Sequence, residues 1–217
     1  MGKRKIKASK KVSFRGKFKS LKMNRMIPWE STIERDFVKI FEFEENFTHI
    51  EAQPLEIIYS YKGKKYRYFP DYLVKTRDNI DIVFEIKDSG MLVDERNLIK
   101  FQVGKMYCYE NGLQYKVITE KEIRKGFLID NLDLLMEVRE LEINITLKNE
   151  IISILDKIGE ITINDLFTHI STSRSDVYTT IFQMIYTKII YTDLFDKLIC
   201  EDNILRLTKY TEGGNNV

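Results

Sequence analysis

Two acidic side chains and one lysine lie in adjacent segments that have the pattern of paired strands. Asp71 follows a proline at the start of one apolar run, and after thirteen intervening residues Glu85 and Lys87 end the next run. Side chains two apart in a strand point to the same face, so Glu85 and Lys87 lie together. A polar turn over residues 76–79 predicts that the two runs are antiparallel neighbours. Carboxylates that hold Mg²⁺ beside a lysine that orients water are suited to phosphodiester hydrolysis.

The same fragments also fit a purely structural role. Pro70-Asp71 is a common turn sequence, and the opposite charges of Glu85 and Lys87 suit any solvated strand face. Short motifs of this kind match by chance at a high rate. The spacing by itself therefore leaves both interpretations open.

A helix is expected just before these strands, over residues 32–44. Ser31 and Glu34 have the spacing of a capping box, and apolar residues then recur every three to four positions. On this spacing alone, Glu34 caps its own helix and has no other role.

The remaining pattern predicts an α/β fold with a mixed sheet flanked by helices. The strand-like and helical runs that follow the first helix are, in order, residues 50–59, 66–69, 71–74, 80–87, 94–110 and 114–119. The strand-like runs before residue 94 predict a meander of three antiparallel strands, with a hairpin turn at 61–65 and residues 80–87 as the third strand. The strand–helix–strand crossover after Lys87 predicts that the last strand pairs in parallel.

Composition indicates a folded protein with room for one core and a smaller second one. The 217 residues are 43% apolar and 12% aromatic, and no apolar run approaches the ~20 residues that cross a bilayer. We expect no secretory signal, since the charged start lacks an apolar segment. Cys108 and Cys200 lie far apart, which predicts reduced thiols in a cytosolic protein. With only His49 and His169 present, we expect no zinc site.

The net charge of +2 hides a strong asymmetry along the chain. Residues 1–29 contain eleven Lys or Arg and no acidic residue, which leaves 24 basic against 33 acidic side chains in the remainder. Residues 1–27 are therefore expected to form a basic arm that tracks nucleic-acid phosphates. The alternative is a solvated tail that only aids solubility.

A second unit is expected after the pattern breaks near residue 145. The runs there are helical at 147–158, 164–170 and 174–187 and strand-like at 189–194 and 198–207. This order predicts a winged-helix-like module, and such modules often place the third helix in a DNA groove. Residues 146–217, however, carry seven basic against ten acidic side chains. The negative balance favours a protein partner over DNA.

Several runs together resemble the TnsA-type transposase endonucleases. These runs follow the same order as in that family and are Gly16–Arg25, Glu30–Phe37, Gln53-Pro54, Phe69–Val74, Glu85–Lys87 and Val117–Arg124. The resemblance covers residues 15–140 and is much weaker beyond residue 145.

The resemblance implies a restriction-endonuclease-like core of the PD-(D/E)xK kind. The family's catalytic glutamate, aspartate and lysine fall on Glu34, Asp71 and Lys87. Glu85 occupies a position that is Gln or Glu in the family. The implied Mg²⁺ ligands are Asp71, Glu85 and the carbonyl of Ile86, with Glu34 completing the site or helping a second ion. Mn²⁺ is expected to substitute for Mg²⁺.

The expected DNA contacts come from the basic arm and from one residue of the core. They are Lys17, Lys19, Lys22, Arg25 and Gln53. For Gln53, a plain hydrogen-bonding role before Pro54 is the alternative.

The resemblance also implies partners and a place of action. Members of the family cut the strand at transposon ends that a DDE-type transposase leaves uncut, in the bacterial cytoplasm. Their C-terminal part docks on that transposase and on an ATP-dependent transposition regulator. The expected domains are an arm (1–27), an endonuclease domain (28–145) and a partner-binding domain (146–217). A stand-alone nuclease of restriction or junction-resolving type and a non-catalytic DNA-binding adaptor are the rival hypotheses.

Overall fold

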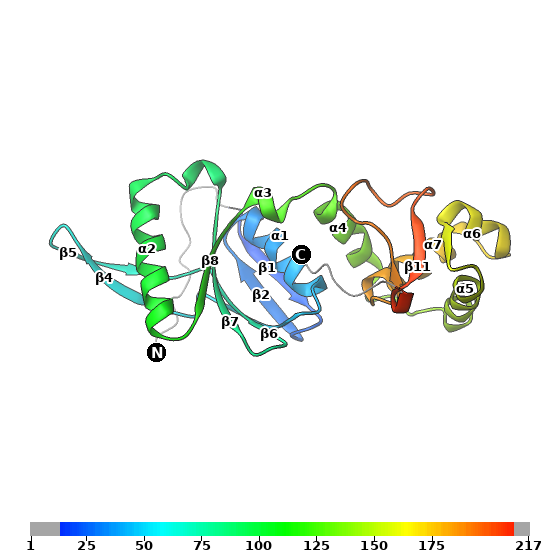
Figure 1. Cartoon of the computed structure of the whole chain (residues 1–217), viewed down its shortest axis with the longest axis horizontal. Coiled ribbons are helices and arrows are strands. Elements are labelled where there is room, and N and C mark those ends of the chain that lie inside the picture. Colours follow the sequence, from blue (N-terminus) through cyan, green and yellow to red (C-terminus); the bar gives the residue numbers. More distant parts are fainter. Residues whose placement is uncertain (1–13, 211–217) are drawn as a thin grey trace. The chain divides into compact units, whose positions relative to one another are not determined.

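The computed structural model describes residues 14–210, and the chain divides into two compact units between Lys125 and Gly126. Each unit has its own strands, helices and buried core (Figure 1). Within the described range, no helix is long and apolar enough to cross a membrane.

The first unit is built on a four-stranded mixed sheet. Its elements are, in order, β1 (Gly16–Ser20), β2 (Arg25–Trp29), α1 (Thr32–Phe43), β3 (Phe47–Ala52), β4 (Ile57–Tyr61), β5 (Lys64–Tyr68), β6 (Tyr72–Thr76), β7 (Asp81–Lys87), the short helix η1 (Ser89–Met91), α2 (Glu95–Glu110), β8 (Gln114–Thr119) and α3 (Glu120–Ile123). The sheet has the order β3-β6-β7-β8, antiparallel across β3/β6 and β6/β7 and parallel across β7/β8. The predicted antiparallel pair and the predicted parallel return after α2 are both confirmed.

Strands β4 and β5 form the predicted hairpin, but they make a separate two-stranded sheet and do not join the main sheet as the expected meander required. Strand β3 instead pairs with β6, and its last residue, Ala52, lies opposite Tyr72. The physical reason lies in the connection: Gln53 has a positive φ of 46°, and Pro54 has no N–H to donate to a ladder. The chain therefore leaves the sheet after β3 and returns to it at β6.

The core of the first unit lies between α1 and the sheet. Strand β7 is buried continuously from Ile82 to Ile86, as expected for a strand covered on both faces. On α1, the ring of Phe37 stacks on Tyr72 with centroids 5.7 Å apart and lies 4.8 Å from the ring of Phe84. These contacts fix α1 against the two central strands.

The predicted basic arm is in part a hairpin that is tied to α1. Strands β1 and β2 pair over residues 16–29. The buried carboxylate of Glu42 on α1 accepts hydrogen bonds from the Ser20 hydroxyl (2.5 Å) and from the backbone N–H of Lys22 (3.1 Å). This part of the arm is thus a fixed element of the domain, and residues 1–13 lie outside the described range.

The second unit combines helices with a small antiparallel sheet. Its elements are α4 (Leu128–Val138), α5 (Ile145–Ile158), β9 (Glu160–Thr162), α6 (Ile163–His169), α7 (Arg174–Tyr186), β10 (Ile190–Tyr191), β11 (Ile204–Leu207) and η2 (Thr208–Tyr210). The strand order is β10-β11-β9.

Helix α4 belongs to this second unit, although the expected endonuclease domain extended to residue 145 and would have included it. The helix packs against α7. Its buried Asn131 donates to the carbonyls of Leu194 and Lys197 (2.9 Å each) and accepts from the N–H of Ile199. Because of these contacts, the boundary between the two units follows residue 125 and not the expected residue 145.

Candidate active site

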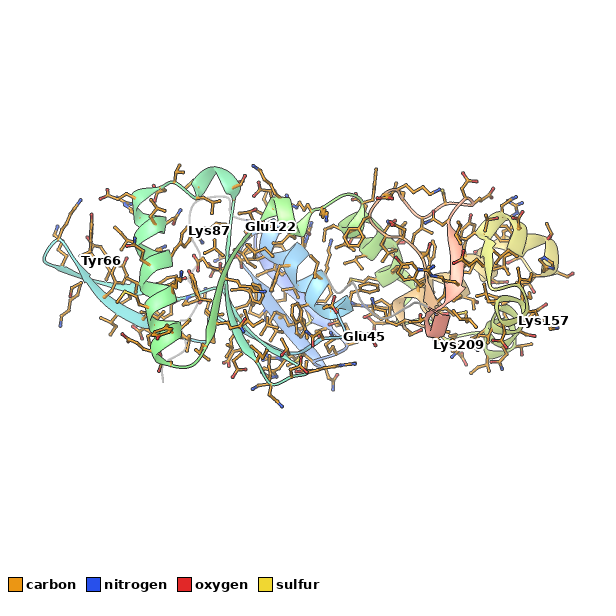
Figure 2. All side chains as sticks on the ribbon, in the orientation of Figure 1. Glu45, Tyr66, Lys87, Glu122, Lys157 and Lys209 are labelled. Atoms are coloured by element: carbon orange, nitrogen blue, oxygen red, sulfur yellow. The ribbon has the colours of Figure 1, made fainter. Side chains whose placement is uncertain are left out.

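Asp71, Glu85 and Lys87 converge where β6 begins and β7 ends. The Lys87 Nζ lies 2.7 Å from Glu85 Oε1 and 3.9 Å from Asp71 Oδ2 (Lys87 is labelled in Figure 2). The strand register produces this meeting: Tyr72 pairs with Phe84, so the residue before β6 lies beside the residues that end β7. The alternation expected of Glu85 and Lys87 also holds, since one amine reaches both carboxylates.

Asp71 is held by the backbone on both sides of its position. Its Oδ2 accepts the N–H of Ile86 at 2.7 Å, and its carbonyl accepts the N–H of Gln53 at 2.8 Å. Its side chain is only 16% exposed. The carboxylate is therefore fixed between the end of β3 and the end of β7.

Glu34 both caps α1 and acts electrostatically on this site. It accepts the N–H of Glu30 (2.8 Å) and the Ser31 hydroxyl (3.0 Å), while its own N–H donates to Ser31 Oγ (3.2 Å), which confirms the predicted capping spacing. The pKa of Glu34 is raised overall. Burial raises it more than those hydrogen bonds and the charge of Lys87 lower it. In turn, the charge of Glu34 helps raise the pKa of Asp71. Glu34 therefore caps α1 and also acts on Asp71 through its charge, while its catalytic role stays a prediction.

The site carries more negative than positive charge. Three carboxylates (Glu34, Asp71 and Glu85) face the single ammonium of Lys87. Burial, and after it the negative charge of Glu85, holds the pKa of Asp71 well above its usual range. Burial alone would lower the pKa of Lys87, but Asp71 and Glu85 outweigh it and raise the pKa above the ordinary value. The lysine thus stays protonated, and a proton or another cation is favoured at Asp71.

Two tyrosines that the sequence reasoning missed complete the site. The Tyr68 hydroxyl donates to Glu85 Oε2 (2.7 Å) and lies 2.9 Å from the Tyr115 hydroxyl. Burial raises the pKa of both phenols, so they remain neutral donors. With Lys87 on its other oxygen, Glu85 is oriented by two partners. The only sequence signal was the position of Tyr68 three residues before Asp71.

Of the predicted DNA contacts, Lys17 and Lys19 are exposed on alternate positions of β1. Lys22 is placed differently, because its amine turns inward at the C-terminal end of α1. The amine donates to the carbonyls of Phe41 (2.7 Å), Glu44 (2.6 Å) and Phe47 (2.9 Å). Carbonyls at a helix end lack helical partners and favour a cation. Lys22 therefore has a structural role here, and this placement does not support it as a phosphate contact.

Arg25 and Gln53 are also engaged by the protein itself. The Arg25 guanidinium donates to the carbonyl of Ile50. Gln53 donates through its side chain to Glu30 (3.3 Å) and through its backbone to the carbonyl of Asp71. Gln53 is thus a neighbour of the acidic site, which fits both roles that the sequence left open for it.

The oxygen ligands fit Mg²⁺ only in part. Within residues 14–210, no group of three or more His, Cys, Asp or Glu side chains is arranged to hold a metal ion. A set in which Glu34 joins Asp71 and Glu85 on one ion is therefore not formed in this conformation. Mg²⁺ is commonly held by one or two carboxylates, with water and substrate phosphate as its other ligands. Asp71 and Glu85 meet that need, provided that the amine of Lys87 moves from Glu85 Oε1.

A comparison with known protein families matches the region that builds this site. Residues 44–120 match the family described as TnsA-like endonuclease N terminal. The match runs from β3 to the start of α3 and includes Asp71, Glu85 and Lys87, while Glu34 precedes it. A search of curated proteins finds no match. Residues 44–120 therefore form a TnsA-like endonuclease N-terminal domain, which supports the assignment of this chain to the TnsA-type endonucleases.

Proposed function

We propose that this chain is the metal-dependent endonuclease subunit of a heteromeric transposase. It hydrolyses one DNA strand at each transposon end, while a DDE-type transposase cuts the other strand. The observation that carries the proposal is the contact of Lys87 with both Glu85 and Asp71 inside the TnsA-like domain. An arrangement of two buried carboxylates and one amine has little structural benefit, because the desolvation of the charges offsets their attraction.

In this proposal Asp71, Glu85 and the carbonyl of Ile86 hold Mg²⁺, for which Mn²⁺ substitutes, and Glu34 completes the site or serves a second ion. The bound ion supplies charge stabilisation for the phosphate in the transition state. Tyr68 keeps Glu85 in place through its 2.7 Å hydrogen bond.

The roles of the protein's own side chains follow from their charges. Lys87 has a raised pKa and is protonated, so it orients the attacking water and offsets phosphate charge instead of accepting a proton. The metal-free pKa values of Asp71 and Glu34 are raised, so a bound cation that offsets their charges favours their ionised, metal-binding form.

We further propose that the second unit binds the transposase or the ATP-dependent regulator. From α5 onward its elements follow the order of a winged-helix module, with β9 between α5 and α6 and with β10 and β11 after α7. On α7, Arg174 forms an ion pair with Glu201 at 2.7 Å, which offsets the positive charge that a DNA groove would need. The net charge of the region also favours a protein partner.

A nicking assay tests the proposal. The full chain, with and without the transposase, is given duplex DNA that carries a transposon end, in Mg²⁺ and in EDTA. Lys87→Ala and Asp71→Asn are expected to lower strand cleavage by about 10²–10³-fold, the usual cost of removing one electrostatic contributor. Lys116→Ala and Asp78→Asn alter exposed residues of the same domain and are the matched controls.

Each rival hypothesis has its own outcome in this assay. Efficient cleavage by the chain alone would support a stand-alone nuclease. Equal cleavage by wild type and Asp71→Asn would remove this site from the reaction. DNA binding without cleavage under any condition, together with no Mg²⁺ or Mn²⁺ binding by calorimetry, would support the adaptor.

A further inference from the structure

The β4–β5 ribbon stands apart from the four-stranded sheet. It is a two-stranded hairpin that extends from beside α2 (Figure 1). Its two turn residues, Lys62 and Gly63, have positive φ angles of 47° and 73°. This is the backbone of a type I′ turn, which matches the twist of the flanking strands and makes a stiff hairpin. The ribbon is therefore a defined element with two faces.

One face of the ribbon packs on the domain. Paired residues in an antiparallel ladder share a face, and this face contains Ile57, Tyr59, Tyr61, Lys64, Tyr66 and Tyr68. Ile57 and Tyr68 are buried, and the Tyr61 hydroxyl donates to Glu95 at the start of α2 (2.6 Å). Tyr59 and Tyr66 stack with ring centroids 5.5 Å apart (Tyr66 is labelled in Figure 2).

The opposite face is open, and we call it the open face. It contains Ile58, Ser60, Lys65 and Arg67. All four are exposed, with 66% of Ile58 and 63% of the Arg67 side chain accessible. An apolar and a basic side chain exposed side by side on a stiff ribbon indicate an interaction surface.

The charge of the ribbon differs from that of the rest of the chain. Residues 57–68 contain four Lys or Arg and no acidic residue, whereas acidic residues outnumber basic ones beyond residue 29. Glu95 pairs with Lys62 and Glu56 with Arg67. Lys64 and Lys65 form no ion pair with any residue of the described range. The ribbon thus carries two cations without counter-ions and suits a polyanion.

The ribbon leads directly into the candidate active site. Tyr68, its last residue, donates to Glu85, and Asp71 follows three residues later. Lys65 and Asp71 are six positions apart in the sequence. This stretch of chain spans at most ~20 Å at roughly 3.3 Å per residue. A DNA phosphate near Lys65 would therefore lie within about six base pairs of the scissile phosphate.

We propose that the open face of the β4–β5 ribbon binds the DNA duplex next to the cleavage site. The proposal rests on the proposed function, since it takes DNA as the substrate. A two-stranded ribbon fits the major groove, and Lys65 on the open face reaches a phosphate on its rim. Lys64 lies on the other face beside the turn, where its exposed side chain reaches a phosphate past the edge of the ribbon. Ile58 and Ser60 then face the groove between them.

A binding assay on the full chain tests this proposal. The variant Lys64→Ser/Lys65→Ser is compared with Lys105→Ser/Lys157→Ser, which removes the same charge from exposed positions on α2 and α5. Binding to a fluorescent 30-base-pair duplex is followed by anisotropy in Ca²⁺ at several salt concentrations. If both lysines contact phosphates, the slope of log K against log salt falls in magnitude by about 1.8, and the affinity falls about 60-fold at 0.1 M salt.

Substrate length supplies a second measurement. The duplex is shortened on one side so that it ends within about six base pairs of the nick. Shortening on the side that the ribbon contacts is expected to lower wild-type affinity to that of the ribbon variant, and shortening on the other side is not. The same truncation leaves the affinity of the ribbon variant unchanged. Far-UV circular dichroism and thermal unfolding confirm that each variant folds.

Three results would overturn the proposal. One is an unchanged affinity and salt slope in the ribbon variant. Another is normal DNA binding with impaired cleavage only when the transposase is present, which would assign the ribbon to a protein partner. The third is aggregation of the variant with an unchanged salt slope, which would mean that the lysines only protect the strand edges. Absence of cleavage by wild type would refute the proposed function but not the role of the ribbon in DNA binding, because binding is measured separately.

Discussion

Replacing Asp71 by Asn is expected to stabilise the metal-free protein while it lowers cleavage by about 10²–10³-fold. The Asn side chain is nearly the same size, and its Oδ1 can still accept the Ile86 N–H, now 2.7 Å from Asp71 Oδ2. The substitution removes one buried negative charge that lies beside Glu85 and Glu34. Lys87 keeps its nearer partner, Glu85, at 2.7 Å.

The magnitude follows from the charges around Asp71. Its attraction to Lys87 at 3.9 Å is about 4 kcal/mol at an effective dielectric constant of about 20. Burial and repulsion from Glu85 each outweigh that attraction, since the pKa of Asp71 is raised in spite of it. The net gain expected from the Asn variant is about 1–2 kcal/mol, typical of a charge relieved at a functional site. This corresponds to a rise of about 2–8 °C in Tm.

The stability gained by Asp71→Asn is expected to increase as the pH rises. Because the folded pKa of Asp71 is raised, the native protein binds this proton more tightly than the unfolded chain does. Wild type therefore loses stability as the pH rises from about 4 through the raised pKa. The Asn variant has no such loss, so the difference between the two proteins grows from pH 5 to pH 8 in EDTA.

Thermal unfolding across this pH range, with and without Mg²⁺, measures both effects. Mg²⁺ at ten times its Kd stabilises wild type by about 1.4 kcal/mol and leaves the Asn variant nearly unchanged. Asp78→Asn, in the exposed β6–β7 turn, is the control and is expected to match wild type. A variant that unfolds at or below the wild-type temperature at pH 8, or a difference that is equal at pH 5 and pH 8, would refute the reasoning.

Two further predictions concern stability and the supports of the site. Lys22→Met removes three hydrogen bonds to helix-end carbonyls and is expected to lower the free energy of unfolding by about 2–3 kcal/mol in a denaturant titration, whereas Lys17→Met on exposed β1 has little effect. Gly104→Ala places a methyl group 2.6 Å from the Tyr115 ring, so we expect a loss of about 1–3 kcal/mol and slower nicking as Tyr68 loses its partner. Gln102→Ala, exposed on α2, is the control, and equal behaviour of both α2 variants would contradict this account.

Sequence patterns predict the elements whose formation depends on residue spacing, capping residues and the length of a connection. The β6–β7 pair follows from alternation around a polar turn, and α1 follows from the capping residues Ser31 and Glu34. The parallel return of β8 follows from the handedness and length of the crossover through α2. Each of these depends on a pattern within one element or on the connection between neighbouring elements.

The parts that were missed depend on distant partners. Nothing near Tyr115 in the sequence indicates that its hydroxyl meets Tyr68, 47 residues earlier. Lys22 lies in a basic segment that is typical of phosphate contacts, but its amine donates to backbone carbonyls 19 to 25 residues away. Strand β3 likewise pairs with β6, beyond the β4–β5 ribbon, because the chain leaves the sheet at Gln53, a backbone conformation that periodicity does not encode.

The distribution of charge separates DNA binding from chemistry in this chain. At the candidate site, three carboxylates against one lysine would repel a phosphate, so this site contributes little affinity for DNA without a bound cation. Exposed cations are found away from this site, among them those on β1 and on the β4–β5 ribbon. Substitutions at Asp71 should therefore remove cleavage with little loss of DNA affinity, and those at Lys64 and Lys65 should lower affinity with the chemical step intact at saturating DNA. A single-turnover measurement at saturating DNA distinguishes the two classes, because only the site variants should remain slow there.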